Sequence, residues 1–380
     1  MIPKNLIAYF FLICINFIGW SGVYANDYSV QDLRKLNAGF QASITAYDTA
    51  KSRSFLEAIL KTLGEENNDN LTASKSQYYI GVYYLQSGKN SEAVNWLKLS
   101  ASMCERMKVM QDTIYSKCLF NLGIAYSHLG DYKRMEQYTL RSLEIEKTLY
   151  GETSPLLLGG LSALVDAYFS LNEYNKAIIY GNKAINLIGG SIENYKSDMA
   201  ILYSNIGACY ARLSDYSKAV LYFEKAEAMY KEYSLPEDDN YINLLNSLAA
   251  NYFFLGLNDK SDEYFNKGIE KIGSSNSVLS LNFLNSFAIV LGNAGKVSKG
   301  EALIVNSLEK AKKFYGPDSR DYFEVIKNYA EYLSTFKIDI RKSLQLYEQC
   351  IVYLNNHEED FSLKAPVLLG YSLALSANGE

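Results

Sequence analysis

A repeat of 42 residues constrains this sequence more than any other feature. Five segments share one pattern: a large apolar residue, a small one in most copies, two variable positions and a tyrosine. These segments are Ile80–Tyr84, Leu122–Tyr126, Leu164–Tyr168, Ile206–Tyr210 and Leu248–Tyr252. Two further copies, around Ala288 and Ala330, follow at steps of 39 and 42 residues. A period of this length indicates an array of small supersecondary units that share one continuous core.

A second set of positions recurs in every copy. Small or apolar residues stand about twelve, sixteen and nineteen residues after the small position, as Ala219, Phe223 and Ala226 do after Gly207. Offsets of three and four residues place such side chains on one helical stripe. A turn separates the two stripes, for example the glycine, aspartate and tyrosine at 130–132. Glycine ends a helix and an acidic residue favours the start of the next, so each repeat is predicted to be one antiparallel helix pair.

Composition agrees with helices and argues against nucleic acid as a partner. The 380 residues include only 5 prolines. There are 37 basic and 42 acidic residues, which gives a net charge of −5. Nucleic-acid binding requires a basic surface, which this balance does not indicate.

The pattern resembles the tetratricopeptide repeat, whose signature is a leucine–glycine pair, a tyrosine, a glycine-aspartate-tyrosine turn, an alanine, an aromatic residue and a further alanine. The best matches are Asn121 to Ser142 and Asn205 to Ala226, and seven copies cover roughly residues 74–356. The resemblance implies an all-α fold, a right-handed superhelical solenoid of antiparallel helix pairs.

The repeat length indicates a subtype. The ordinary tetratricopeptide repeat has 34 residues, so the extra residues are expected to lengthen the second helix and the turn after it. The connectors Leu149–Pro155 and Phe314–Ser319 look like the leucine-glycine-x-x-histidine-proline connector of kinesin-light-chain-type repeats. Their histidine is absent here, so the resemblance concerns the repeat and not the biology of kinesin.

Residues 1–25 have the layout of a secretory signal peptide. Lys4 is the only charged residue before Asp27, and an apolar run from Leu6 to Ile18 is interrupted only by Asn16. Small residues at the −3 and −1 positions predict cleavage after Ala25. The alternative is an uncleaved anchor, although the run is shorter than the roughly 20 residues that a membrane span needs. We therefore expect a bacterial protein that is exported to the periplasm.

The two ends of the array differ from its repeats. Residues 26–73 are predicted to form two capping helices, from Asp32 to Thr49 and from Ser54 to Leu63. Residues 357–380 look like the first helix of an eighth copy, opened by Pro366. They can be a terminal helix, but the absence of charge between Lys364 and Glu380 favours a longer protein, because a capping helix exposes a polar face.

No arrangement of residues indicates catalysis, a metal or a cofactor. The two histidines, His128 and His357, are far apart, and the sequence contains no phosphate-binding loop, nucleophile elbow or zinc-protease motif. Cys104 and Cys118 flank a predicted turn and could form a disulfide in an oxidising compartment, or remain buried thiols. The chain is therefore predicted not to be an enzyme.

Asparagines recur on the first helices, where a solenoid of helix pairs normally binds its partners. Asn121, Asn205 and Asn328 stand two residues before the small position, and Asn246 and Asn285 stand three before it. A side-chain amide donates and accepts hydrogen bonds, so this row could hold an extended peptide, as the resemblance to kinesin-light-chain-type repeats also implies. Alternatively, the amides bond neighbouring helices across the stack.

The lysine–asparagine clamp of chaperone-binding tetratricopeptide repeats is absent. Tyr78 and Phe120 occupy the lysine position in the first two copies and predict an apolar or aromatic ligand surface there. Lys75 and Lys117 would add a weak preference for acidic segments. The tyrosines at the fifth position of each segment are predicted to be core residues with a hydroxyl at a wet edge.

The sequence thus predicts a scaffold that binds a protein or peptide in the concave groove of a solenoid outside the cytoplasm. Contact with a membrane would occur only through the signal segment or a missing C-terminal region. The alternative is the sensory or recruiting part of a larger protein, because similar exported arrays precede histidine kinase, DNA-binding or CHAT-type protease domains.

Overall fold

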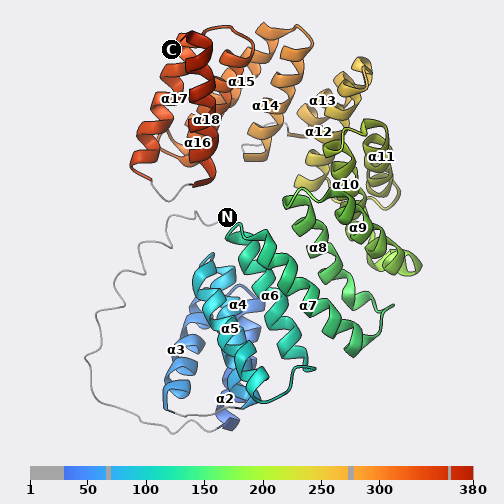
Figure 1. The fold of residues 1–380 in the computed structure, drawn as a ribbon, viewed down its shortest axis with the longest axis vertical. Coiled ribbons are helices and arrows are strands. Elements are labelled where there is room, and N and C mark those ends of the chain that lie inside the picture. Colours follow the sequence, from blue (N-terminus) through green and yellow to red (C-terminus); the bar gives the residue numbers. More distant parts are fainter. Residues whose placement is uncertain (1–29, 66–69, 273–277, 358–360, 380) are drawn as a thin grey trace. The chain divides into compact units, whose positions relative to one another are not determined.

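The computed structural model describes residues 30–65, 70–272, 278–357 and 361–379, and every regular element within these ranges is a helix (Figure 1). The predicted signal peptide and its cleavage site lie outside the described residues. None of the described helices is long and apolar enough to cross a bilayer.

The helices alternate between a first and a second member of each pair. The first helices are α2 (Val30–Thr45), α4 (Leu71–Gln86), α6 (Thr113–His128), α8 (Leu158–Ser170), α10 (Lys196–Arg212), α12 (Asp239–Phe254), α14 (Val278–Asn293), α16 (Arg320–Thr335) and α18 (Phe361–Asn378). The second helices are α3 (Thr49–Glu65), α5 (Asn90–Arg106), α7 (Tyr132–Tyr150), α9 (Tyr174–Ile188), α11 (Tyr216–Glu232), α13 (Asn258–Ile272), α15 (Val297–Tyr315) and α17 (Ile340–Asn355). Short 3₁₀ helices, η1 (Pro155–Leu157) and η2 (Gly189–Asn194), precede α8 and α10.

The two members of each pair have similar lengths. Second helices α5 to α17 have 15 to 19 residues, and first helices α4 to α16 have 13 to 17. The longest helices are the second helices α7 and α15, with 19 residues each. The expectation that the extra residues lengthen the second helix and the turn after it stays a prediction.

The chain forms two compact units, one ending at Leu129 and the other beginning at Gly130. In the first unit, α2 pairs with α3 and α4 pairs with α5. Phe40, Ile59 and Ile80 are completely buried in its core. At the small position of this unit, a Cβ atom added to Gly81 would lie 2.6 Å from Leu97 Cγ, so α4 and α5 approach too closely for a larger residue.

Cys104 and Cys118 of the first unit are free, buried thiols. Cys118 donates a hydrogen bond to the Ser100 hydroxyl (3.1 Å), and Cys104 Sγ lies 3.2 Å from Ser74 Oγ. Burial raises the pKa of Cys118 to about 12. In this structure the two cysteines therefore act as small core residues that bond serines of neighbouring helices, and not as a disulfide.

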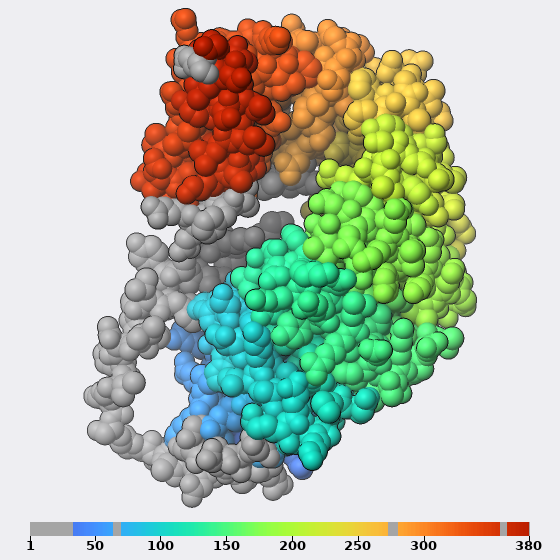
Figure 2. Space-filling view, viewed as in Figure 1, coloured from blue at the N-terminus to red at the C-terminus, as the bar shows by residue number. Residues whose placement is uncertain are grey.

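The second unit, α7 to α18, contains five of the predicted helix pairs, from α8–α9 to α16–α17. The fourth copy shows the packing: Ala219 and Ala226 are completely buried, and Phe223 lies against Gly207, whose added Cβ would be 2.9 Å from the phenyl ring. Side chains close the spaces between the ribbons of neighbouring helices, as the green and yellow part of Figure 2 shows. The predicted all-α array of paired helices is confirmed.

The turns between paired helices follow their sequence signals. Asn172 and Ser214 adopt left-handed backbone conformations, with φ of 59° and 60°, at the place where the first helix ends. The Asp131 carboxylate accepts a hydrogen bond from the Arg134 amide, and the Asp215 carboxylate accepts one from the Lys218 amide. These aspartates are N-caps, which explains why an acidic residue follows the turn.

The start of the last helix differs from the prediction. Pro366 was expected to open it, but α18 begins at Phe361 and contains the proline in its second turn. Leu363 and Val367 are completely buried against the preceding pair. This burial offsets the cost of a proline inside the helix, where the missing amide hydrogen removes one intrahelical hydrogen bond.

Candidate functional site

The first helices of the second unit form one continuous face. Backbones of successive first helices are in contact from α8 through α10, α12, α14 and α16 to α18. Among the described residues of this unit, no two successive second helices approach each other to the same extent. We call the side chains that project from α8, α10, α12 and α14 on this side the first-helix face.

The first-helix face carries very little charge. Helix α14 has no Asp, Glu, Lys or Arg, and Asp166 is the only such residue of α8. On α10 and α12 these residues are confined to the ends, as Arg212 and Asp239 show. The second helices α11 and α13, in contrast, have charged residues along their whole length. A ligand on the first-helix face would therefore meet mainly amides, hydroxyls and small apolar groups.

Three of the predicted asparagines hydrogen-bond a neighbouring first helix. The amide of Asn121 donates to the hydroxyl of Tyr78 (3.4 Å) and that of Asn205 to the carboxylate of Asp166 (3.5 Å). Asn246 donates to the Ser286 hydroxyl (3.3 Å). The alternative role, in which the amides connect helices across the stack, is thus present in the structure. The distances are long, so these bonds are weak. Asn121 also donates to the Lys117 carbonyl (2.9 Å), and the side-chain oxygen of Asn246 is buried without a hydrogen-bond partner.

The remaining two asparagines differ from each other. Asn285 is only 5% exposed, and both its amide nitrogen and its oxygen are buried without a hydrogen-bond partner. It cannot contact a ligand unless α14 moves. Asn328 is half-buried on α16. The structure therefore places Asn205 and Asn246 together on the first-helix face and separates Asn285 from it by burial.

The predicted residues of the first two copies lie on α4 and α6, which contact each other. Tyr78 and Phe120 are half-buried, Lys75 is half-buried and Lys117 is exposed. Burial raises the pKa of Tyr78 to about 12, so its hydroxyl is protonated and can accept the bond from Asn121 while donating another.

Asp166 is a member of the first-helix face that the sequence did not reveal. Its side chain is accessible to solvent, yet the surrounding protein atoms partly desolvate the carboxyl and raise its pKa to about 6. In the sequence it stands one residue after Val165, where five other copies carry Val, Ile or Ala and the last copy carries Glu331.

Three of the five tyrosines at the fifth position are core residues, as predicted, and Tyr84 and Tyr210 are half-buried. Tyr126, Tyr168 and Tyr252 are at most 3% exposed. Three of these five tyrosines stack on a second tyrosine from the paired helix, with ring centroids 5.3 to 5.5 Å apart. The pairs are Tyr168–Tyr180, Tyr210–Tyr222 and Tyr252–Tyr264. A lysine eleven residues after the small position lies over each first ring, at 4.8 to 5.3 Å, namely Lys176, Lys218 and Lys260.

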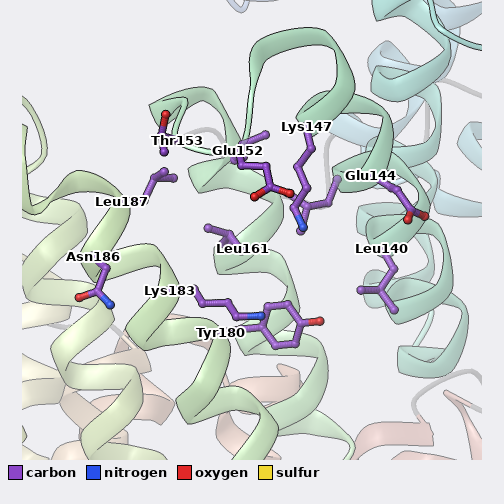
Figure 3. A pocket seen from close by; sticks show the side chains of 12 residues that line it. Leu140, Glu144, Lys147, Glu152, Thr153, Leu161, Tyr180, Lys183, Asn186 and Leu187 are labelled. Atoms are coloured by element: carbon purple, nitrogen blue, oxygen red, sulfur yellow. The ribbon is translucent and has the colours of Figure 1, made fainter.

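An open groove of about 670 Å³ lies between the second helices α7 and α9 (Figure 3). We call it the α7–α9 groove. Its floor includes Leu143, Leu157 and Leu161, which are at most 6% exposed. In Figure 3, Lys147 enters the groove from the top of the view, and Lys183 lies below Leu161, beside the ring of Tyr180. Lys183 Nζ is 4.9 Å from the centre of that ring.

The described residues contain no group of three or more His, Cys, Asp or Glu side chains that could hold a metal ion. His128 is exposed and its Nδ1 is 3.1 Å from the Asn90 side chain, whereas His357 Nδ1 is 2.9 Å from the Tyr353 carbonyl. Neither histidine lies beside a nucleophile in the contacts that the structure shows.

These features describe an array of paired helices. The sequence profile of the family described as tetratricopeptide repeat matches residues 113–188 and 198–271. In these two stretches the chain carries tetratricopeptide repeats. The kinesin-light-chain-like subtype and export stay predictions. A search of curated protein sequences gives no match.

Solved structures of similar fold share little sequence with this chain. The apo quorum sensor NprR from B. thuringiensis aligns with a TM-score of 0.66 at 16% identity, over 86% of this chain and 88% of that one. A Rap protein complexed with competence and sporulation factor aligns with a TM-score of 0.53 at 16% identity, over 94% and 92%. Aspartyl phosphate phosphatase F from Bacillus subtilis aligns with a TM-score of 0.53 at 17% identity, over 88% and 96%. At these identities the likeness concerns the fold.

Proposed function

We propose that this chain is a scaffold that binds a peptide or protein segment on the first-helix face. The observation that carries the proposal is the nearly uncharged surface of α8 to α14, which presents Asn205 and Asn246 beside hydroxyls and small side chains. Such a surface can pair with the backbone of an extended segment while reading few charged side chains. The complex of a Rap protein with competence and sporulation factor is an example of a partner bound to a similar fold.

The test is the pair of substitutions Asn205→Ala and Asn246→Ala in one chain. A binding peptide is first selected from a displayed library against the full chain, and its affinity is measured by fluorescence anisotropy. We expect the double variant to bind about 10-fold to 100-fold more weakly, because each lost amide removes hydrogen bonds to the peptide. The melting temperature should fall by no more than about 2–4 °C, since the existing inter-helix bonds are long.

Asn175→Ala is the matched control, because Asn175 is an exposed asparagine on the second helix α9. It should change neither affinity nor melting temperature. A double variant that loses stability but keeps its affinity would show that the asparagines only join helices, and would refute binding on the first-helix face.

We also propose that the mature chain acts outside the cytoplasm. The support is the apolar N-terminal segment with its small residues before Asn26. Expression in a Gram-negative host, followed by fractionation and N-terminal sequencing, is expected to recover the protein in the periplasm with Asn26 as its first residue. Recovery of an intact Met1 in the cytoplasmic fraction would contradict export.

A further inference from the structure

The α7–α9 groove is best understood by comparison with the equivalent place two repeats later. There, second helices α11 and α13 are joined by a buried carboxylate. Glu227 of α11 is 4% exposed. Its carboxylate forms ion pairs with Lys267 (2.6 Å) and Lys231 (3.0 Å) and accepts a hydrogen bond from the hydroxyl of Tyr264 (2.9 Å). A second ion pair, between Lys271 and Glu237 (2.6 Å), closes the same gap.

The three donors recur in the α7–α9 groove, and the acceptor does not. Two repeats of 42 residues before Tyr264, Lys267 and Lys231 stand Tyr180, Lys183 and Lys147, and all three line the groove. The residue equivalent to Glu227 is Leu143, which is 3% exposed in the floor. The positions of Glu237 and Lys271 are held by Thr153 and Leu187, so the second ion pair is absent as well.

The donors keep the same arrangement in both places. Lys267 lies over the ring of Tyr264 at 5.7 Å, and Lys183 lies over the ring of Tyr180 at 4.9 Å. Among the described side chains, Lys147 and Lys183 form no ion pair within 4.0 Å, although Glu144 and Glu152 also line the groove. Figure 3 shows the Glu144 side chain directed away from the two lysines.

We propose that the α7–α9 groove binds an acidic, leucine-containing segment of a partner protein, whose carboxylate takes the place that Glu227 occupies between α11 and α13. Two ammonium groups and a phenol hydroxyl bind one carboxylate through charge-assisted hydrogen bonds. The leucine floor receives the aliphatic side chains beside it. This surface belongs to second helices and does not depend on the proposed function of the first-helix face.

The experiment uses the full chain and a defined probe. The probe is a fluorescein-labelled helical peptide with one glutamate between leucines on the same face, compared with the same peptide carrying glutamine. We expect the glutamate peptide to bind about tenfold more tightly than the glutamine peptide, and this preference to decrease with salt. Lys183→Met should abolish the preference, whereas the matched variant Lys225→Met, one repeat later on α11, should retain it.

A third variant, Leu143→Glu, places the missing carboxylate inside the chain. It should remove the preference for glutamate while a circular dichroism melt shows a folded protein. If this variant does not fold, the comparison of Lys183→Met with Lys225→Met decides the question. Three results would overturn the proposal: neither peptide binds measurably, both peptides bind equally well, or the preference for glutamate remains in Lys183→Met.

Discussion

Replacing Phe265 by alanine is expected to lower the free energy of unfolding by about 3–5 kcal/mol. The phenyl ring is completely buried, stacks on Phe287 at a centroid distance of 4.2 Å and meets the edge of Phe283 at 5.8 Å. It thereby joins α13 to the next helix, α14. Truncation removes the ring from two aromatic contacts and leaves a cavity between repeats, which a rigid helix pair cannot close. Urea unfolding followed by circular dichroism measures the loss.

Phe314→Ala is the control for this substitution. Phe314 is 45% exposed near the end of α15, so its removal should change stability by no more than about 0.5 kcal/mol. Since each repeat is stabilised mainly by its neighbours, the Phe265 variant is also expected to broaden the transition as the repeats around α13 and α14 unfold first. Equal losses in the two variants would show that the repeat interface is not the source of stability.

The buried stripe could be predicted from the sequence because every copy repeats the same physical contact. Small and large residues recur at fixed offsets where one helix packs against the next, so seven copies reinforce one pattern. Gly207 and Phe223 illustrate this, because the absence of a side chain at Gly207 leaves the space that the Phe223 ring fills. A local signal such as Pro366 was less informative, since tertiary burial of Leu363 extended the helix beyond it.

The candidate site was less predictable because it depends on which side chains meet across different repeats. The periodic asparagines showed where amides would recur, but not that Asn285 would be buried. Tyr180 and Lys183 of the α7–α9 groove also recur at 42-residue spacing, and Lys147 has its equivalent, Lys231, two repeats later. The proposed role of these residues depends on the comparison with Glu227, which stands where other repeats carry apolar residues. Only the structure shows that Glu227 of α11 forms an ion pair with Lys267 of α13.

Lys267→Met is expected to lower the free energy of unfolding by about 2–3 kcal/mol at neutral pH, because it leaves the carboxylate of Glu227 buried with fewer donors. Burial alone would raise the pKa of Glu227, but hydrogen bonds from Lys267, Lys231 and Tyr264 outweigh it and lower the pKa below its usual value. A folded-state pKa below the unfolded one adds stability above the unfolded pKa, and this stability is lost as the pH falls through the folded value. The difference between wild type and variant should therefore shrink below about pH 4.

Glu227→Leu is expected to cost less than Lys267→Met, although it removes the residue that accepts all three contacts. Lys267, Lys231 and Tyr264 are partly exposed and can turn to water, whereas the buried carboxylate cannot. The chain itself carries the equivalent arrangement, since Leu143 faces Lys183 and Lys147 in the α7–α9 groove. The double variant Glu227→Leu with Lys267→Met should recover most of the stability that Lys267→Met loses. A double variant as unstable as the sum of the two single variants would show that the carboxylate and the lysine act independently.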